Sequence, residues 1–545
     1  MPDNDDRISE PAADGELDVA IVGAGFSGLY MLHRVRDVLK LKTRVFEAAD
    51  GVGGTWYWNR YPGARCDSES YFYCYSFSKD LEQEWTWTSK FPEQPEILSY
   101  LNHVADRFDL RRDIQLNTRV TGALFEDRSN RWIISTDTGE TVSARFLISA
   151  VGCLSTRNLP DIPGIESFAG EHYHTGNWPH EGVDFRGKRV GLIGTGSTGI
   201  QAAPVIAEEA EHLYVFQRTP NFSVPARNTP LTAERTAEIK ANYDEIRRIS
   251  RTSGFGFPYE TPEHAAMEVT PEERQCVYEQ RWHEGGTSFG FRSFSDILSD
   301  QAANDSASDF IRSKIRETVK DPEVAELLIP HDHPYGTKRP PLDTNYFETY
   351  NRDNVTLVDV RSAPIKEITP RGVRTARDEY ELDVIVFATG FDAMTGALLA
   401  MNIEGSGGLR LSDKWANGPV TYLGLQVAGF PNLFTITGPG SPSVLANMPV
   451  AIEQHVEWVS DCLEHLYANG ISRIETTQAA EKGWVRHVAE EGDATLFPLA
   501  NSWYVGANIP GKTRVFMPYV GGMGKYRDHC DRSAKHGYEG FVLSA

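Results

Sequence analysis

The chain has 545 residues, of which 40% are hydrophobic and 24% are charged, proportions that are typical of globular proteins. A chain of this length predicts two or three domains instead of one compact core. Its net charge of −22 argues against nucleic acid or an anionic membrane as a partner, because both carry negative charge themselves. The six cysteines have no CxxC spacing, which favours a reducing compartment such as the cytoplasm, and no segment is apolar for the length of a membrane span.

The first nucleotide-binding pattern follows an acidic stretch, residues 1–16, that we expect to be a flexible tail. Residues 19–22 are typical of a buried parallel strand, and a glycine-rich turn comes directly after them. Residues 29–39 have helical spacing, and residues 43–46 favour the next strand. This part of the chain therefore predicts one β-α-β unit.

The same order of elements occurs a second time further along the chain. Residues 190–193 favour a strand, residues 200–207 a helix and residues 213–216 the following strand, with a glycine-rich turn after the first strand. The fold class that we predict is α/β, with two Rossmann-like dinucleotide-binding domains and a helical insertion in the second.

The remaining segments predict how the two domains are completed. Residues 131–135 and 146–151 favour further strands of the first sheet, and residues 154–179 are typical of a crossing linker. Apolar residues recur at helical spacing later in the chain, namely Ile239, Tyr243, Ile246 and Ile249, and again Ile311, Ile315 and Val319. Asp321 and Pro322 favour the start of a further helix. The predicted domains are 17–152 with 391–545 for the first nucleotide, 153–224 with 331–390 for the second, and 225–330 for the insertion.

The first glycine fingerprint consists of Gly23, Gly25 and Gly28, between a strand and a helix. Such glycines allow a tight turn and a close approach of a pyrophosphate to the helix N-terminus. Glu47 follows the next strand, where a carboxylate can accept hydrogen bonds from two ribose hydroxyls. This pattern favours FAD or NAD, neither of which has a 2′-phosphate.

The second fingerprint, Gly194, Gly196 and Gly199, is followed at the end of the next strand by Arg218. An arginine can bind a 2′-phosphate that a carboxylate would repel, so this site favours NADPH. Two such sites predict electron transfer between a nicotinamide and a flavin. A dithiol reductase is disfavoured because no two cysteines are spaced as a redox pair.

A motif between the two fingerprints indicates the family. Phe168, Gly170, His174, Trp178 and Pro179 fit the pattern FxGxxxHxxxWP, and with it the chain resembles the Baeyer-Villiger monooxygenases. The resemblance extends over nearly the whole chain and includes residues 51–67, 336–339, 388–392, 438–448 and 501–510.

The resemblance implies that NADPH reduces FAD, that O₂ then forms a C4a-peroxyflavin, and that this species attacks a ketone to give an ester or lactone. Arg339 matches the family's catalytic arginine, whose permanent charge stabilises developing negative charge. Asp67 matches the acidic partner that holds this arginine. The resemblance leaves the ketone open as cyclic, aryl or steroid-like, and the expected assembly is a monomer or a weak homo-oligomer.

Cofactor-binding residues are carried over from the two fingerprints and from the resemblance. For FAD they are Gly23, Gly25, Ser27, Gly28, Glu47, Thr55, Trp56, Asp67, Tyr73, Val120 and Met448. For NADP they are Arg65, Cys66, Thr195, Gly196, Ser197, Thr198, Gly199, Ile200, Gln201, Arg218, Thr219, Lys338, Arg339 and Trp503. Trp503 is expected to close over NADP and to exclude water.

Two alternatives remain open from the sequence. A flavin monooxygenase that oxygenates nitrogen or sulfur shares this architecture, and a nucleotide-binding sensor without turnover would keep the fingerprints. His174 is expected to fix the linker and not to react. We predict no metal site, because the pairs His172/His174 and His331/His333 have no convincing further ligands nearby.

Overall fold

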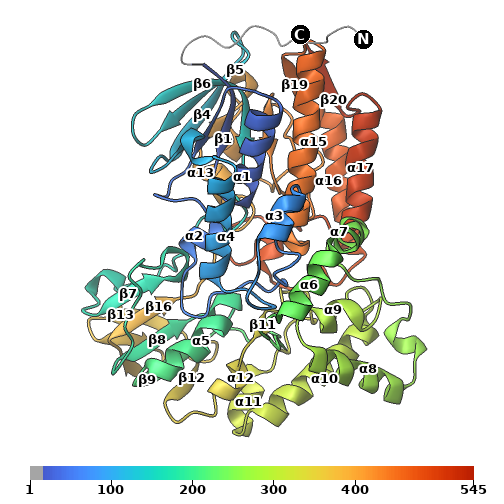
Figure 1. Ribbon diagram of the computed structural model, residues 1–545. Coiled ribbons are helices and arrows are strands. Elements are labelled where there is room, and N and C mark those ends of the chain that lie inside the picture. The colour runs from blue at the N-terminus through green and yellow to red at the C-terminus, as the bar shows by residue number, and fades with distance from the viewer. Residues whose placement is uncertain (1–15) are drawn as a thin grey trace.

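The structure is a computed structural model that describes residues 16–545. The predicted tail lies outside these residues except for Glu16, which is the first residue of strand β1 (Glu16–Val22) and therefore belongs to a sheet. Figure 1 shows one sheet in the upper half of the molecule and a second in the lower half, each with helices beside it. Each sheet contains the two strands of one of the predicted β-α-β units.

The upper sheet has eight strands and combines parallel with antiparallel pairs. β1 pairs parallel with β2 and β6, and its last four residues are buried, as expected for a central strand covered on both faces. β4 and β5 instead alternate between buried and more exposed residues, which is typical of antiparallel strands with one face in solvent. In spatial order the strands are β17 (Ile403–Glu404), β4 (Val120–Glu126), β5 (Arg131–Thr136), β6 (Thr141–Ser149), β1, β2 (Thr43–Phe46) and β3 (Ile114–Gln115), and β18 (Leu433–Thr435) pairs with β6.

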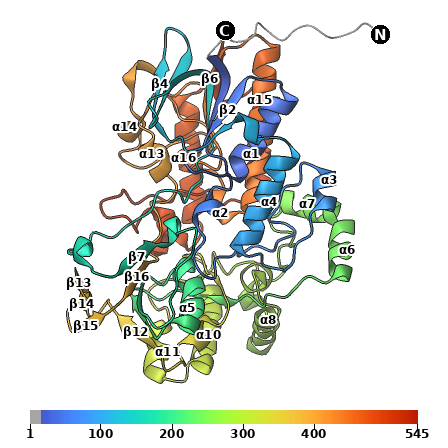
Figure 2. The same ribbon diagram turned by 60° about the vertical axis from the view of Figure 1, so that its left-hand side comes forward.

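The C-terminal part of the chain returns to this upper sheet. β17 and β18 pair with β4 and β6, and helix α15 (Met448–Ala468) contacts helix α1 (Phe26–Leu32), which follows the first glycine turn. Helix α16 (Gln478–Asp493) lies near α15 in both views (Figures 1 and 2). Helix α17 (Met523–Lys535) contacts α15 and stands beside it in Figure 1. The first nucleotide region is therefore built from both ends of the chain.

The lower sheet has five parallel strands, and the second glycine turn follows its central strand β8. One part of the sequence prediction was wrong here: β7 lies inside the segment expected to be a linker, and it pairs with β16 as an edge strand. In spatial order the strands are β12 (Val355–Asp359), β9 (His212–Gln217), β8 (Arg189–Ile193), β16 (Val384–Phe387) and β7 (Glu171–His174). Helix α5 (Ser197–Glu209) follows β8, and a small antiparallel sheet is formed by β13 (Ile365–Thr369), β14 (Gly372–Thr375) and β15 (Glu379–Glu381).

Helices fill the segment between the two halves of the lower sheet. The apolar residues at helical spacing over 239–249 lie in helices as predicted, but in two helices separated at Asn242. Asp321 caps the last helix by accepting hydrogen bonds from the backbone of Glu323 and Val324, with Pro322 in the first turn as predicted. The helices are α6 (Ala233–Ala241), α7 (Tyr243–Thr252), α8 (Pro271–Glu284), α9 (Ser288–Arg292), α10 (Gln301–Thr318) and α11 (Pro322–Leu328).

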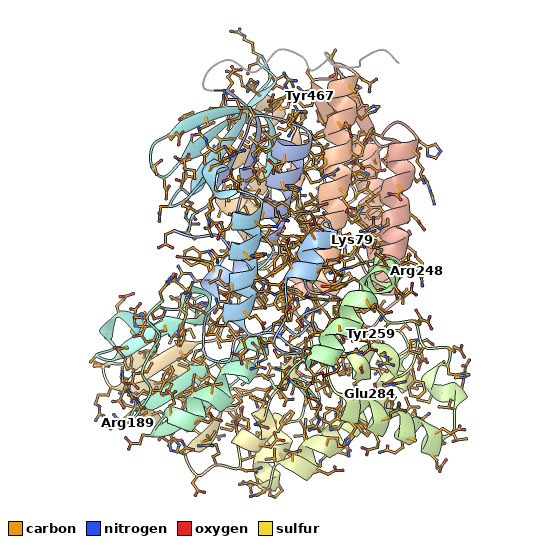
Figure 3. All side chains as sticks on the ribbon, in the orientation of Figure 1. Lys79, Arg189, Arg248, Tyr259, Glu284 and Tyr467 are labelled. Atoms are coloured by element: carbon orange, nitrogen blue, oxygen red, sulfur yellow. The ribbon has the colours of Figure 1, made fainter. Side chains whose placement is uncertain are left out.

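Polar contacts fasten this helical segment to the first nucleotide region. Arg247 on α7 forms a buried ion pair with Glu82 at 2.8 Å. The Tyr259 hydroxyl donates a hydrogen bond of 3.1 Å to Glu69, and Lys79 pairs with Asp244 (Figure 3). No helix among residues 16–545 is long and apolar enough to cross a lipid bilayer.

Candidate functional site

A large cavity of about 1430 Å³ joins the two nucleotide regions. Its walls include the first glycine turn with Glu47, the second glycine turn with Arg218, and Arg339. Ligand sites of α/β proteins are expected at the carboxyl ends of parallel strands, and both glycine turns follow the last residue of such a strand. The cavity therefore brings both predicted nucleotide sites into contact with one space.

The first glycine turn is held in a shape that only glycine allows. Gly23 has φ +103°, and a Cβ on Gly28 would lie 1.8 Å from the Gly23 carbonyl oxygen, so the helix approaches the turn very closely. The Glu47 carboxylate accepts hydrogen bonds from the backbone N–H groups of Ala24 at 2.7 Å and Ala49 at 2.9 Å. Because each carboxylate oxygen has a second lone pair, Glu47 fixes the turn and can still accept from a ribose.

The residues predicted for FAD lie along this part of the cavity, with Gly28 behind the turn as the exception. Burial raises the pKa of Glu47, and the backbone donors act against that effect. Deeper in the cavity the Trp56 indole N–H donates to the Tyr73 hydroxyl at 3.2 Å. The predicted residues that line the cavity are Gly23, Gly25, Ser27, Glu47, Thr55, Trp56, Asp67, Tyr73, Val120 and Met448.

The second glycine turn repeats the geometry of the first. Gly194 has φ +113°, and a Cβ on Gly199 would lie 2.1 Å from the Gly194 carbonyl oxygen. Gly199 and the fully buried Ile200 therefore support the turn from behind and do not line the cavity. The other predicted NADP residues do line it, and they are Arg65, Cys66, Thr195, Gly196, Ser197, Thr198, Gln201, Arg218, Thr219, Lys338, Arg339 and Trp503.

Three positively charged side chains line the cavity near the second glycine turn. Arg218, Lys338 and Arg361 all line it, and Asp332 lies with its carboxylate 4.0 Å from the Lys338 ammonium. Burial lowers the pKa of Lys338, and the charges of the two arginines lower it further. A bound phosphate would relieve this repulsion, which fits a nucleotide that carries a 2′-phosphate.

Arg339 lies with Asp67 in the middle of the cavity wall. The Arg339 Nε atom is 3.6 Å from Asp67 Oδ2, and Nη1 donates a hydrogen bond of 3.3 Å to the Val444 carbonyl oxygen. Burial raises the pKa of the Asp67 carboxyl against the opposing effect of the Arg339 guanidinium. The Asp67 side chain is 10% exposed and that of Arg339 is 37% exposed, so the guanidinium faces the cavity while its partner is enclosed.

His174 is the buried last residue of strand β7. Its Nδ1 atom accepts a hydrogen bond of 3.0 Å from the Gly176 backbone N–H, and burial lowers its pKa to about 4. A neutral histidine with backbone partners fits the structural role predicted for it. His174 does not line the cavity.

Sequence reasoning missed several residues of this site, and three of them contact or lie near Lys338 and Arg339. Arg361 and Asp332 line the cavity beside Lys338, and the Val444 carbonyl oxygen accepts from Arg339. Arg361 comes two residues after the end of β12, so its place at the carboxyl end of a parallel strand was the available signal. A backbone acceptor such as Val444 leaves no signature in a sequence.

The two dinucleotide sites and the shared cavity fit an enzyme that uses two nucleotides, and comparison with known proteins shows that it is an FAD- and NADPH-dependent monooxygenase. A family model described as flavin-binding monooxygenase-like matches residues 16–227. A Baeyer-Villiger monooxygenase of Pseudooceanicola batsensis is 46% identical, over 97% of this chain and 96% of its own. A phenazine N-monooxygenase of Lysobacter antibioticus is 45% identical over 97% of each chain.

Among solved structures, an oxidized steroid monooxygenase bound to NADP is 55% identical. It matches with a TM-score of 0.93 over 97% of this chain and 99% of that one. The chain therefore belongs to the Baeyer-Villiger monooxygenase family, as the motif at 168–179 predicted.

Proposed function

We propose that this enzyme oxygenates a small-molecule ketone to an ester or lactone, with Arg339 as the catalytic residue and Asp67 as its partner. The observation that carries the proposal is the Arg339 guanidinium, 3.6 Å from Asp67, exposed to the one cavity that both glycine turns share. When bound, FAD reduced by NADPH supplies the electrons and the site at which O₂ reacts. Overall, one oxygen atom enters the ketone and the other leaves as water.

Arg339 supplies a fixed positive charge to the reacting groups. Addition to a ketone carbonyl places negative charge on its oxygen, and a preorganised guanidinium stabilises that charge more effectively than water does. Asp67 and the Val444 carbonyl oxygen hold the guanidinium on one side, which leaves its remaining N–H groups free for substrate. The indole of Trp503, which lines the cavity, is proposed to exclude water from the site.

The ketone is proposed to be cyclic, aryl or steroid-like. The steroid monooxygenase at 55% identity supports a large substrate, and the relative named for N-oxidation supports keeping nitrogen oxygenation as the second candidate. A panel of cyclohexanone, phenylacetone, a 20-ketosteroid and phenazine, with mass analysis of products, separates these classes. Formation of the N-oxide without any ester would contradict the ketone proposal.

The decisive experiment for Arg339 is the Arg339→Ala variant. Reduction of bound flavin by NADPH, followed as absorbance loss in the stopped flow, is expected to stay within about threefold of the parent, whereas ester formation falls by roughly a hundredfold or more. Arg352→Ala, at an exposed arginine outside the cavity, is the matched control. Ester formation at the parental rate in Arg339→Ala would refute the assigned role.

We also propose the predicted domain boundaries, a cytoplasmic location, and a monomer or weak homo-oligomer. The upper sheet combines strands from the first 150 residues with strands from beyond residue 400, because β17 pairs with β4 and β18 with β6. This pairing supports a discontinuous first domain. Limited proteolysis near residues 225 and 330, with light scattering of the intact protein, tests the boundaries and the assembly.

A further inference from the structure

A loop of the first nucleotide region rests directly on helix α5 of the second. Gly63, in this loop, has φ +79°, and a Cβ at that position would lie 2.4 Å from the Gln201 carbonyl oxygen and 3.1 Å from Val205. Any side chain there would push the loop away from the helix. The contact is therefore a close backbone approach between a loop of the first nucleotide region and a helix of the second.

The side chain of Gln201 is fully engaged by this loop. Its Oε1 atom accepts hydrogen bonds from the Tyr61 hydroxyl at 2.8 Å and from the Arg65 backbone N–H at 3.4 Å. Its Nε2 atom donates to the Arg65 carbonyl oxygen at 3.2 Å and to Asp67 Oδ1 at 3.3 Å. An amide has two N–H groups and two acceptor lone pairs, so all four positions have a partner within the protein.

The Asp67 carboxylate consequently lies between two side-chain donors, and the Leu342 backbone also stabilises its charge. Oδ1 faces the Gln201 amide and Oδ2 faces the Arg339 guanidinium at 3.6 Å. A buried carboxylate is stable only when its oxygens have donors, and a donor on one oxygen also orients the other. Gln201 is 9% exposed, so water competes little for this contact.

We infer that Gln201 is a positioning residue, which holds Asp67 opposite Arg339 and thereby couples the packing of helix α5 to the placement of the catalytic guanidinium. The sequence analysis placed Gln201 among the predicted NADP-binding residues. In the structure its amide instead forms hydrogen bonds with residues 61–67, the Asp67 loop. This inference rests on the proposed roles of Arg339 and Asp67.

The test compares Gln201→Glu with Gln201→Met in the FAD-loaded enzyme, with cyclohexanone or whichever panel ketone gives the most ester as probe. At pH 8 the introduced carboxylate faces Asp67 and cannot donate, so ester formed per NADPH is expected to fall about tenfold. At pH 6 its protonated form can donate as the amide does, and the deficit is expected to shrink to about threefold. Gln201→Met has no titrating group, so its deficit stays the same at both pH values.

Two further measurements separate positioning from general damage. Flavin content and the rate of flavin reduction by NADPH are expected to stay within about twofold of the parent in both variants. Gln280→Glu introduces the same charge at an exposed position of α8 outside the cavity, and should leave ester yield unchanged.

Each outcome decides one proposal. The positioning role is overturned if the ester yield of Gln201→Glu does not recover at pH 6. It is also overturned if flavin reduction slows as much as ester formation, and Gln201 would then be assigned to nicotinamide binding. The assignment of Arg339 fails separately, through parental ester formation in Arg339→Ala.

Discussion

The two glycine turns have nearly the same backbone but different surroundings. In each, the first glycine has a positive φ and a Cβ on the third would lie about 2 Å from a carbonyl oxygen, at 1.8 Å for Gly28 and 2.1 Å for Gly199. After the next strand, the first region has the buried carboxylate of Glu47 and the second has the exposed Arg218. Glycines at these positions fit a general pyrophosphate cradle, and we propose that the residue after the second strand selects the nucleotide.

The largest expected effect comes from filling each turn in the same way. Gly28→Val and Gly199→Val both force the helix away from its turn, at an expected cost of at least ~3 kcal/mol. If the two cradles serve different nucleotides, Gly28→Val should purify without yellow flavin, whereas Gly199→Val should keep its FAD and lose reduction by NADPH. Flavin absorbance per protein and stopped-flow reduction provide the two measurements.

An exposed glycine provides the control for this pair. Gly139 has no atom within 4 Å of a built Cβ and has a positive φ, which Gly28 and Gly199 lack, so Gly139→Val shows the effect of backbone strain without a clash. Loss of FAD from Gly199→Val as well would mean that the two turns do not fail independently.

The next effect concerns the buried carboxylate of each region. Glu47 has two backbone N–H donors, whereas Asp343 in strand β11 (Leu342–Asp343) has the Ser223 hydroxyl at 2.7 Å, and burial raises the pKa of Asp343 to about 6. Since the folded state holds this proton more tightly than the unfolded state, stability is lost as the pH rises through this range. Asp343→Asn should therefore be more stable than the parent at pH 8, by ~3 kcal/mol, with the difference vanishing near pH 4.

Thermal unfolding of FAD-loaded parent and variant between pH 4 and pH 8 measures this difference. Glu47→Gln should lack such a gain, because the introduced amide N–H₂ would face a backbone donor. A parent that is less stable than Asp343→Asn by the same amount at every pH would contradict the titration of Asp343.

Selection of the nucleotide is tested by removing the positive charge after the second strand. Arg218→Ala is expected to raise the KM for NADPH about tenfold, because a charge-assisted contact to the 2′-phosphate is lost. The KM for NADH, which has no such phosphate, should change little. Steady-state kinetics with both coenzymes measure the ratio, and an equal rise for NADH would assign Arg218 to a general electrostatic effect.

Both β-α-β units could be predicted because their strands are apolar runs and their turns contain glycines at fixed spacing. β7 could not, because its four residues include exposed ones and form no apolar run. It is a strand only through pairing with β16, which lies far along the chain. The break at Asn242 was missed because the apolar spacing continues across it.

The site was predictable to a different degree. Glu47 and Arg218 follow from the position of strand ends, which is local information. The pairing of Arg339 with Asp67 came from the family resemblance, since nothing local in either segment indicates that they meet. The engagement of Gln201 by the Asp67 loop depends on how two sheets are placed against each other, and neither periodicity nor a motif contains that placement.

The smallest expected effect distinguishes the inner from the outer cations of the second region. The Lys338 side chain is mostly buried, with 18% of its surface exposed, whereas Arg361 is an exposed residue of the cavity lining. Exposed charges are screened by water and salt, so Arg361→Ala should raise the KM for NADPH only about threefold. This rise should disappear in 0.5 M salt, a concentration at which the screening length is roughly 4 Å. Arg371→Ala, exposed and outside the cavity, is the control, and a salt-independent rise in Arg361→Ala would place Arg361 in direct contact with the phosphate.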